Sequence, residues 1–589
     1  MPISLSAKFK KAVLALASQL LASGSRFTFL HRPSLSGKLW WILAACESGD
    51  GIDNMGHQTE HRPTNRTVEE WRSMPTWLRY GVIGLLVLGI FLRFYHLDRK
   101  VYWIDETSTS LRTLGYTRQE VLQNAFTGQV ISVEDFRQYQ RLSPEKGWGD
   151  TLNALAGSAE HTPLYFLLSR FWVGLVGHSV ATMRFLTALF SVLAIPCLYW
   201  LCRLLFAAPA VAWVTIAWYA ITPIHVLYAQ EARPYSLLTL LTLLSSALLL
   251  KAVQVGKRWH WVAYSAAIAM GLYTQLLFSL VAIAQGIYIL AIEQVWRKRF
   301  TQTIVAYLIA GGAAALSFLP WIILLITRQE QVSESTVSLS GSFPLSYMVD
   351  RWTFHLNQAL LDRDLASANL LIVLLSGFAL YFLCRRTTPK TWLFVLLLAT
   401  IPFLGLAIPD LLNGGRRSLR IRYLFPFILG VQLALAYLMT TLALEMRGWK
   451  QKVGQLLLVL FIVAGVIACS ISSQAVVWWN KSNPRSAYYP IVSEIINQEK
   501  NPLVISDGSV SDTLAFSAWL RPDIKLQLVE DFHSLKIAEG YAPIFLLNPE
   551  PDNRKIVRQD YQLKLIYEDR TDPEDIEQRL WAVSKRQRN

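Results

Sequence analysis

The chain has 589 residues, of which 53% are hydrophobic and only 16% are charged, and its mean hydropathy is +0.32. Apolar runs of about 17–25 residues recur along most of it, and each run is long enough to cross a bilayer as a helix. This composition excludes an ordinary soluble protein and predicts a polytopic protein whose surroundings are the lipid bilayer. The net charge of +15 does not indicate nucleic acid as a partner, because the basic residues gather in short loops between the apolar runs.

The N-terminal region, residues 1–76, differs in kind from the rest of the chain. Three lysines between positions 8 and 11 precede an apolar stretch, 12–22, that resembles a signal peptide. A cleaved signal would make the first span run inward, against the charges of the later loops. We therefore predict a poorly ordered cytoplasmic tail, with a true translation start at Met55 or Met74 as an alternative.

Residues 77–477 are predicted to form an all-α polytopic membrane bundle of about 11 transmembrane helices. Every second connection is rich in Arg or Lys, and the positive-inside rule assigns those connections to the cytoplasm. The N-terminus is then cytoplasmic, in a plasma or inner membrane, and the C-terminus lies outside. The predicted spans are 77–95, 180–206, 209–227, 235–255, 259–274, 276–295, 303–327, 369–384, 392–409, 423–445 and 453–477.

The first outer loop is expected to carry helices at the membrane interface. Its polar part has helical patterning near 117–126 and 149–159. The apolar segment 163–177 is short and contains Arg170. If this segment crossed the membrane, every later basic loop would lie outside, so we predict that it lies flat with Arg170 facing lipid head groups.

Residues 478–589 have the composition of a soluble domain, and we predict a small α/β domain on the outer face. Short runs at 503–506, 525–529, 544–547 and 563–567 are typical of strands, and a helix is expected near 510–520. About 110 residues can bury a modest core of their own.

Two adjacent carboxylates, Asp105 and Glu106, follow the first span by about ten residues, after Tyr102 and Trp103. Hydrocarbon repels carboxylates, so the pair is expected at the water boundary, held there by interfacial aromatic rings. A carboxylate at that depth could deprotonate a hydroxyl group of a substrate. The alternative is a pair of solvated loop acids.

A second charge cluster lies in the outer loop 414–423, which contains four arginines although outer loops are normally poor in positive charge. The planar guanidinium group suits phosphate oxygens, so Arg420 and Arg422 are candidate phosphate ligands. The alternative is that this loop is cytoplasmic. The basic loops on both sides of it, 385–390 and 447–452, argue against that alternative.

Two further outer segments contain candidate residues. In 228–235, Glu231 and Arg233 are expected to form a charge pair at head-group level, although such a pair is often only structural. His161 opens the flat segment, and a lone histidine more often packs or hydrogen-bonds than acts as a base. These loops show no spacing typical of a metal site, and the five cysteines suggest neither a disulfide framework nor zinc. No cofactor is certain, and a divalent cation remains open.

Taken in chain order, these motifs resemble those of the integral-membrane glycosyltransferases of the C-type fold. More narrowly, they resemble the dolichyl-phosphate-mannose-protein mannosyltransferase group, glycosyltransferase family 39, which includes the bacterial aminoarabinose transferase type. The resemblance covers about residues 77–477 and leaves out the C-terminal domain. The residues that carry it are Asp105-Glu106, His161-Thr162-Pro163-Leu164-Tyr165, Ala229-Gln230-Glu231-Ala232-Arg233-Pro234-Tyr235 and Arg422-Tyr423.

The resemblance implies inverting transfer of a monosaccharide from a polyprenyl-phosphate donor at the outer, periplasmic or lumenal, face. Asp105 matches the catalytic base, and Glu106 its neighbour near the donor or acceptor. Thr162 replaces the first proline of the family's His-Pro-Pro element. The residues that the resemblance and the charge clusters assign to substrate binding are His161, Tyr165, Glu231, Arg233, Tyr235, Arg420, Arg422 and Tyr423.

Two other functions fit many spans and a basic outer site. One is a transporter or flippase of lipid-linked sugars, and the other is a polysaccharide ligase or polymerase. Transporters commonly carry ionisable residues at mid-membrane, whereas the charges here gather at one face, which favours an enzyme. The acceptor, whether protein, lipid or glycan, is not indicated by the sequence.

Overall fold

The computed structural model describes residues 71–72, 74–294, 301–336, 340–481, 486–569 and 578–586. All of them belong to one compact unit, Glu70–Asn589. The predicted N-terminal tail lies almost wholly outside the described residues.

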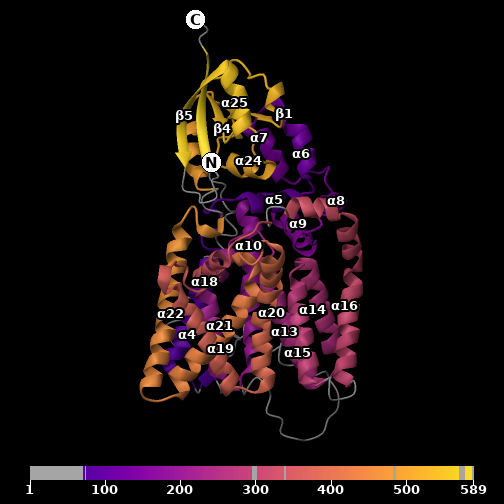
Figure 1. Cartoon of the computed structure of the whole chain (residues 1–589), viewed down its shortest axis with the longest axis vertical. Helices are drawn as coiled ribbons and strands as arrows, with labels where there is room; N and C mark the ends of the chain where they lie inside the picture. The colour runs from indigo at the N-terminus through magenta and orange to yellow at the C-terminus, as the bar shows by residue number, and fades with distance from the viewer. Residues whose placement is uncertain are drawn as a thin grey trace, which may run out of the picture. The chain divides into compact units, whose positions relative to one another are not determined.

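Long apolar helices form the membrane bundle (Figure 1). Within the described residues, eight helices are long and apolar enough to cross a membrane, and a bent pair makes a ninth if it counts as one span. The all-α polytopic class predicted from the sequence is thereby confirmed. The eight are α4 (Thr76–Phe94), α10 (Val180–Leu205), α13 (Tyr235–Val255), α16 (Gln302–Thr327), α19 (Asn369–Arg386), α20 (Pro389–Asn413), α21 (Phe425–Thr440, prolonged to Glu445 by a π-helical turn) and α22 (Trp449–Gln474).

Each of the other three predicted spans also coincides with helical structure. Two of them are the shorter helices α14 (Arg258–Thr274) and α15 (Phe278–Ile292). The third is the bent pair α11 (Pro209–Ile221) and α12 (Pro223–Ala229), whose axes meet at 55°. The number of helices that cross the bilayer stays a prediction.

The bend in the third of these segments has a local cause. Thr222 is extended (ψ 125°) and precedes Pro223, and a residue before proline avoids the helical region. The Thr222 hydroxyl donates to the carbonyl oxygen of Trp218 at 2.7 Å, which satisfies one of the acceptors that the break leaves open. Beyond α12, residues 230–234 form the turn that contains Glu231 and Arg233.

The segment between α4 and α10, predicted to be the first outer loop, is mostly helical. It contains α5 (Ile104–Thr113), α6 (Arg118–Ala125), α7 (Val133–Phe136), the 3-10 turn Arg137–Gln140, α8 (Trp148–Ala156) and α9 (Leu164–Val176). Helices α6 and α8 confirm the patterning near 117–126 and 149–159. The prediction that Arg170 faces head groups is wrong. Arg170 is buried and donates to Thr113 O at 3.1 Å and to Thr151 Oγ1 at 2.9 Å, because these acceptors inside the loop need a donor.

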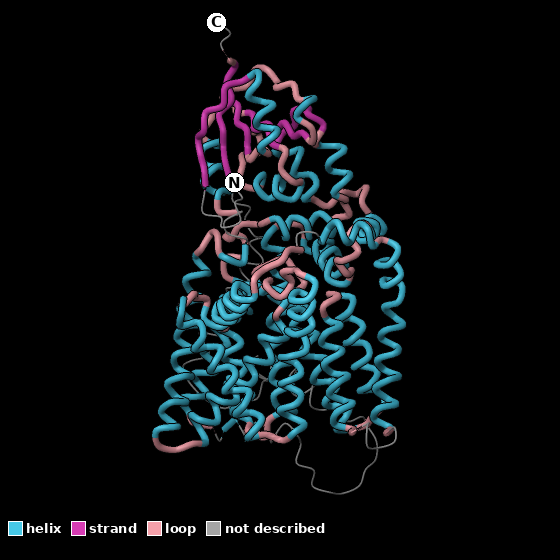
Figure 2. Tube along the Cα trace, in the orientation of Figure 1, coloured by secondary structure: helices cyan, strands magenta, loops and turns pink. Residues whose placement is uncertain are grey.

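The C-terminal region forms a six-stranded sheet of order β1-β3-β2-β4-β6-β5 (Figure 2). Strands β2 (Leu503–Ser506), β3 (Lys525–Val529) and β4 (Ile544–Leu547) are parallel, and β5 (Tyr561–Asp569) pairs with β6 (Gln578–Lys585) in the antiparallel sense. The four strands predicted from the sequence are confirmed. Helices α23 (Tyr488–Asn497), α24 (Val510–Ser517) and α25 (Pro551–Asp560) accompany the sheet.

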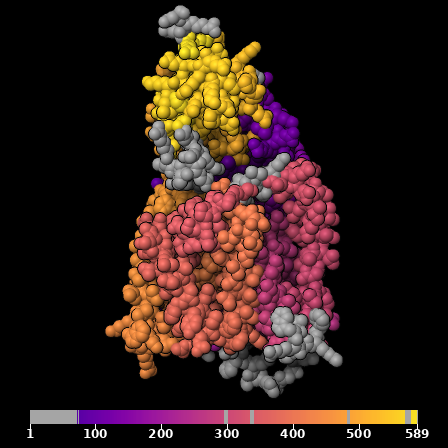
Figure 3. All heavy atoms as spheres, in the orientation of Figure 1, coloured from indigo at the N-terminus to yellow at the C-terminus, as the bar shows by residue number. Residues whose placement is uncertain are grey.

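One strand of this sheet comes from the segment between α4 and α10, the predicted first outer loop. Strand β1 (Thr127–Ser132) pairs antiparallel with β3, so that Thr127 faces Val529 and Ser132 faces Lys525. Figure 3 shows the yellow atoms of the C-terminal region against indigo atoms of the first loop. A single hydrophobic core joins the two regions. It includes Val101, Trp103, Leu111, Val121, Phe136, Tyr488, Val492, Leu514, Phe516 and Leu526.

Candidate active site

Asp105 lies at the centre of a cluster of charges drawn from distant parts of the chain. It occupies the first turn of α5, where the helix dipole favours a carboxylate. Its Oδ2 atom accepts a hydrogen bond from Nη1 of Arg422 at 2.8 Å and lies 3.9 Å from Nη2 of Arg233. Nη1 of Arg233 also donates to the backbone oxygen of Asp105 at 3.3 Å. The structure thus brings together the acid and the two cations that the sequence analysis singled out.

The charge state of Asp105 follows from these neighbours. Burial opposes its ionisation, but Arg422 and Arg233 outweigh burial and hold the pKa of Asp105 below its usual value, with smaller contributions from His161 and Arg420. The side chain remains 24% exposed. Asp105 is therefore an ionised carboxylate at neutral pH that a substrate can still reach.

Glu106 is enclosed on all sides. It is fully buried, and its Oε1 accepts from Nε of Arg184 at 2.8 Å and from the amide of Ala232 at 2.8 Å. Its Oε2 accepts from Nη2 of Arg184 at 2.7 Å and from Nζ of Lys481 at 2.9 Å. Burial opposes ionisation here too, but Arg184 and Lys481 lower the pKa of Glu106 to about 2. This geometry does not support the predicted contact with donor or acceptor, because both oxygens are already occupied.

Arg184 and Lys481 are two members of this site that sequence reasoning missed. Arg184, in the second turn of α10, also donates to the carbonyl oxygens of Leu97 at 2.7 Å, Lys100 at 2.9 Å and Val101 at 2.8 Å. Burying an arginine in an apolar span costs free energy unless the arginine has an acidic partner. The position of Arg184 in a predicted span was therefore the sequence signal that could have indicated a buried ion pair. No comparable signal in the sequence marks Lys481.

Glu231 and Arg233 turn to different partners, so the predicted charge pair between them is wrong. Glu231 is fully buried and its Oε2 lies 3.5 Å from Nζ of Lys481 and 3.0 Å from Nδ2 of Asn480, which donates to it. Burial raises the pKa of Glu231 to about 7, although Lys481 opposes the shift. Arg233 instead donates to Asp105 and to Oγ1 of Thr109 at 3.0 Å, because the two side chains leave the tight turn in different directions.

The arginine loop 414–423 is held in place by helix α18 (Leu345–Leu361). Nε1 of Trp352 donates to Oγ of Ser418 at 3.2 Å, and Nε2 of His355 lies 2.8 Å from the carbonyl oxygen of Leu419. These contacts fix the backbone that leads to Arg422. Its guanidinium carbon lies 5.7 Å from the ring centres of both Trp103 and Tyr423.

The other residues predicted to bind substrate differ in their exposure to solvent. Tyr165 is fully buried with its hydroxyl 3.1 Å from Oγ1 of Thr187, so its predicted role in binding substrate lacks an accessible surface. Tyr235 is buried as well and stacks on Phe425, with ring centres 5.9 Å apart. The side chain of His161 is 24% exposed and its pKa is lowered to about 4, chiefly by burial and by Arg112, so it is neutral at pH 7.

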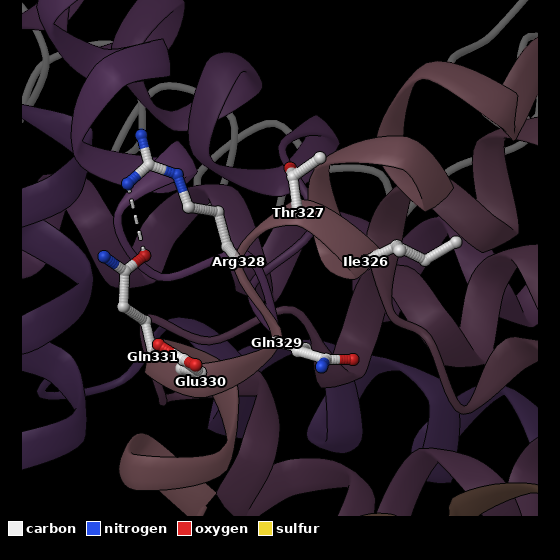
Figure 4. A pocket seen from close by; sticks show the side chains of 6 residues that line it. All are labelled: Ile326, Thr327, Arg328, Gln329, Glu330 and Gln331. Carbon is white, nitrogen blue, oxygen red and sulfur yellow. Dashed lines mark hydrogen bonds between the residues drawn. The ribbon is translucent and has the colours of Figure 1, made fainter.

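Two other features lie apart from this cluster. Within the described parts of the chain, no group of three or more His, Cys, Asp or Glu side chains could hold a metal ion. A surface hollow of about 300 Å³ lies at the end of α16 and the start of α17 (Gln329–Thr336), lined by residues 326–331 (Figure 4). In it, Nη1 of Arg328 donates to Oε1 of Gln331 at 3.4 Å, and none of the predicted site residues takes part.

Comparisons with known proteins agree with this architecture. ArnT from Cupriavidus metallidurans in the apo state matches with a TM-score of 0.52 and 13% identity, covering 86% of this chain and 97% of that chain. The same protein bound to undecaprenyl phosphate matches with a TM-score of 0.49 and 14% identity, covering 86% of this chain and 98% of that chain. The oligosaccharyltransferase of Archaeoglobus fulgidus in the apo form matches with a TM-score of 0.45 and 13% identity. That match covers 77% of this chain and 64% of that chain. No curated protein matches the chain by sequence.

The similarity to ArnT confirms the polytopic membrane fold that the resemblance implies. A family match agrees with a membrane glycosyltransferase of the C-type fold. Within that class, residues 160–324 match the family model described as dolichyl-phosphate-mannose-protein mannosyltransferase. The matched segment begins at Glu160 and includes Glu231 and Arg233, but it contains neither Asp105 nor Arg422.

Proposed function

We propose that the chain transfers a monosaccharide from a polyprenyl-phosphate donor to an acceptor at the outer membrane face, by an inverting single displacement. The observation that carries this proposal is the Asp105 carboxylate in contact with Arg422 at 2.8 Å and beside Arg233 at 3.9 Å. A base and two phosphate-binding cations are the groups that such a transfer needs. The matched family model, whose description names a dolichyl-phosphate sugar, supports this class of donor.

The chemical step assigns one role to each charged group. Asp105 removes the proton of an acceptor hydroxyl, whose oxygen attacks the anomeric carbon of the sugar. The bond from that carbon to the phosphate oxygen breaks, and the lipid phosphate leaves with the electron pair. Arg422 and Arg233, with Arg420 nearby in the same loop, stabilise the negative charge that develops on it.

The same arginines can adjust the strength of the base. With both guanidinium groups directed at Asp105, its pKa is low and it is a weak proton acceptor. A donor phosphate that binds Arg422 and Arg233 shares their positive charge, which raises the pKa of Asp105. The carboxylate then becomes a competent base only when the donor is in place.

The direction of the spans supports the outer face as the location of the site. Arg233 lies two residues before the start of α13, whereas the basic residues Lys257 and Arg258 follow the other end of that helix. The 21 residues of α13 span about 30 Å, the thickness of the hydrocarbon core. If the basic loops are cytoplasmic, Asp105 and its arginines lie outside.

The test is transfer by the purified protein in lipid nanodiscs, with a labelled polyprenyl-phosphate monosaccharide and a native-membrane extract as the source of acceptors. The expected product is a labelled glycoside of inverted anomeric configuration. Movement of intact donor between leaflets would instead indicate a flippase, and a requirement for a lipid-diphosphate oligosaccharide would indicate a ligase or polymerase. Either of these results would contradict the proposal.

A further inference from the structure

Lys481 joins the segment after the last membrane helix to both acid-bearing parts of the active site. It ends the 3-10 turn Trp479–Lys481, which follows α22, and its side chain is fully buried. Its Nζ lies 2.9 Å from Oε2 of Glu106 and 3.5 Å from Oε2 of Glu231, and it donates to Gln230 O at 3.3 Å. The ammonium group therefore donates hydrogen bonds to acceptors from two separate elements and forms an ion pair with a second carboxylate.

Those two elements carry Asp105 and Arg233, to which the proposed function assigns the acceptor proton and the donor phosphate. Glu106 is the neighbour of Asp105 on α5, and Glu231 lies two residues before Arg233 in the turn between α12 and α13. Arg233 depends on the same alignment, because it donates to Asp105 O at 3.3 Å and to Thr109 Oγ1 at 3.0 Å across the two elements. A shift of the turn relative to α5 would separate the base from a phosphate ligand.

The charges of this buried network balance. When Glu231 is ionised, it and Glu106 carry the negative charges and Arg184 and Lys481 the positive ones, and all four side chains are fully buried. Loss of Lys481 would leave Glu231 as a buried carboxylate without an ion-pair partner among the described residues, and such a group is strongly unfavourable unless it takes up a proton. No donor among the described residues reaches its Oε1 atom, and the amide of Asn480, which donates to Oε2 at 3.0 Å, carries no charge to replace that of Lys481.

The segment around Lys481 is held in place from outside the network. The indole of Trp478 donates to Oδ2 of Asp362 at 3.0 Å, and the indole of Trp479 donates to Oδ1 of the same residue. Asp362 caps the C-terminus of α18, the helix that also fastens the arginine loop. On the other side, the hydroxyl of Ser486 donates to the backbone oxygen of Lys481. These contacts fix the position of the Lys481 backbone beside the active site.

We propose that Lys481 is a positioning residue of the transfer reaction, an inference that rests on the proposed function. Its ammonium group holds α5 and the 230–234 turn in the register that places Asp105 beside Arg233. The segment after the last span is then part of the active centre, although it lies beyond both the family-model match and the region of sequence resemblance.

The experiment compares Lys481→Met, the double variant Lys481→Met/Glu231→Gln, and the control Lys585→Met, in which an exposed lysine paired with Glu539 at 2.7 Å loses its charge. A misplacement of about 1 Å can reduce turnover about 100-fold, and we expect a loss of about that size in kcat for Lys481→Met. The double variant restores the charge balance and should recover to within about tenfold of wild type, one factor of ten being about 1.4 kcal/mol. Lys585→Met should leave kcat unchanged.

The pH profile separates this role from simple loss of packing. Without Lys481 the pKa of Glu231 rises further, so the network is neutral at low pH and carries a net negative charge at high pH. The defect of Lys481→Met relative to wild type should therefore be smaller at pH 6 than at pH 8, and the double variant should show no such trend. The charged and titratable groups that face Glu231 are Lys481, Glu106, Asp105, Arg422, Arg184 and Tyr228.

Every outcome of this experiment either supports or overturns the positioning role of Lys481. An unchanged kcat in Lys481→Met, a defect that does not vary with pH, or a double variant no better than the single one would overturn the positioning role. If Lys481→Met does not accumulate as folded protein, a double variant that folds and transfers sugar supports the role, and one that also fails to fold refutes it. A wild-type protein that transfers no sugar refutes the proposed function itself, which is a separate result.

Discussion

Replacing Asp105 by asparagine separates the base from the rest of the site. The amide has nearly the same size but cannot take up the acceptor proton, and a positioned base typically contributes about 10²–10⁴-fold to the rate. We therefore expect kcat to fall by that factor, equivalent to about 3–5 kcal/mol. Donor affinity should be retained or improved, because Arg422 (2.8 Å) and Arg233 (3.9 Å) would no longer be held by a competing carboxylate.

The assay measures single-turnover sugar transfer and, separately, donor binding by titration. Asp523→Asn is the matched control, since Asp523 is 67% exposed and pairs only with the nearby Arg521 at 3.2 Å among the ion pairs of the described residues. Its kcat and donor affinity should equal those of wild type. An Asp105→Asn protein whose turnover stays within about tenfold of wild type would refute Asp105 as the base.

Two further predictions follow from the same contacts. Arg422→Ala should raise the donor KM at least about tenfold through loss of a charge-assisted contact. Arg417 lies in the same loop with its side chain 45% exposed, and Arg417→Ala should change the donor KM little. Equal effects of the two substitutions would argue against a phosphate site at Arg422. Glu106→Gln should destabilise the protein at neutral pH. Because the folded-state pKa of Glu106 is about 2 and its ordinary value is 4.5, its stabilisation is complete above about pH 4.5 and is lost as the pH falls toward 2. Thermal unfolding of wild type and variant should converge on acidification, and a gap that widens would contradict this assignment.

Features with local or periodic signals could be predicted from the sequence. Hydropathy located each helix of the bundle, since a span must be apolar over its whole length. Strands β2, β3 and β4 were found at their observed bounds because each is a short run rich in Leu, Ile, Val or Phe between turn residues. The proximity of Asp105 to Arg422 also followed, because the order of spans and loop charges placed both at one end of the bundle.

Features that depend on contacts between distant residues could not be predicted. Strand β1 contains Gly128 and is only partly buried, so nothing local distinguishes it from loop; it becomes a strand by pairing with β3. The spacing of Glu231 and Arg233 predicts a charge pair, but the turn directs Glu231 to Lys481 and Arg233 to Asp105. Lys481 lies about 250 residues from one of its partners, Glu231, and no periodicity connects them.

The most direct test is an experimental structure of the protein in lipid nanodiscs with bound polyprenyl phosphate. We predict that the phosphate oxygens lie within hydrogen-bonding distance of Arg422 and Arg233, with the Asp105 carboxylate beside them and facing the position of the acceptor. A phosphate bound at the opposite end of the helices, near Lys257 and Arg258, would contradict the assignment of the active site.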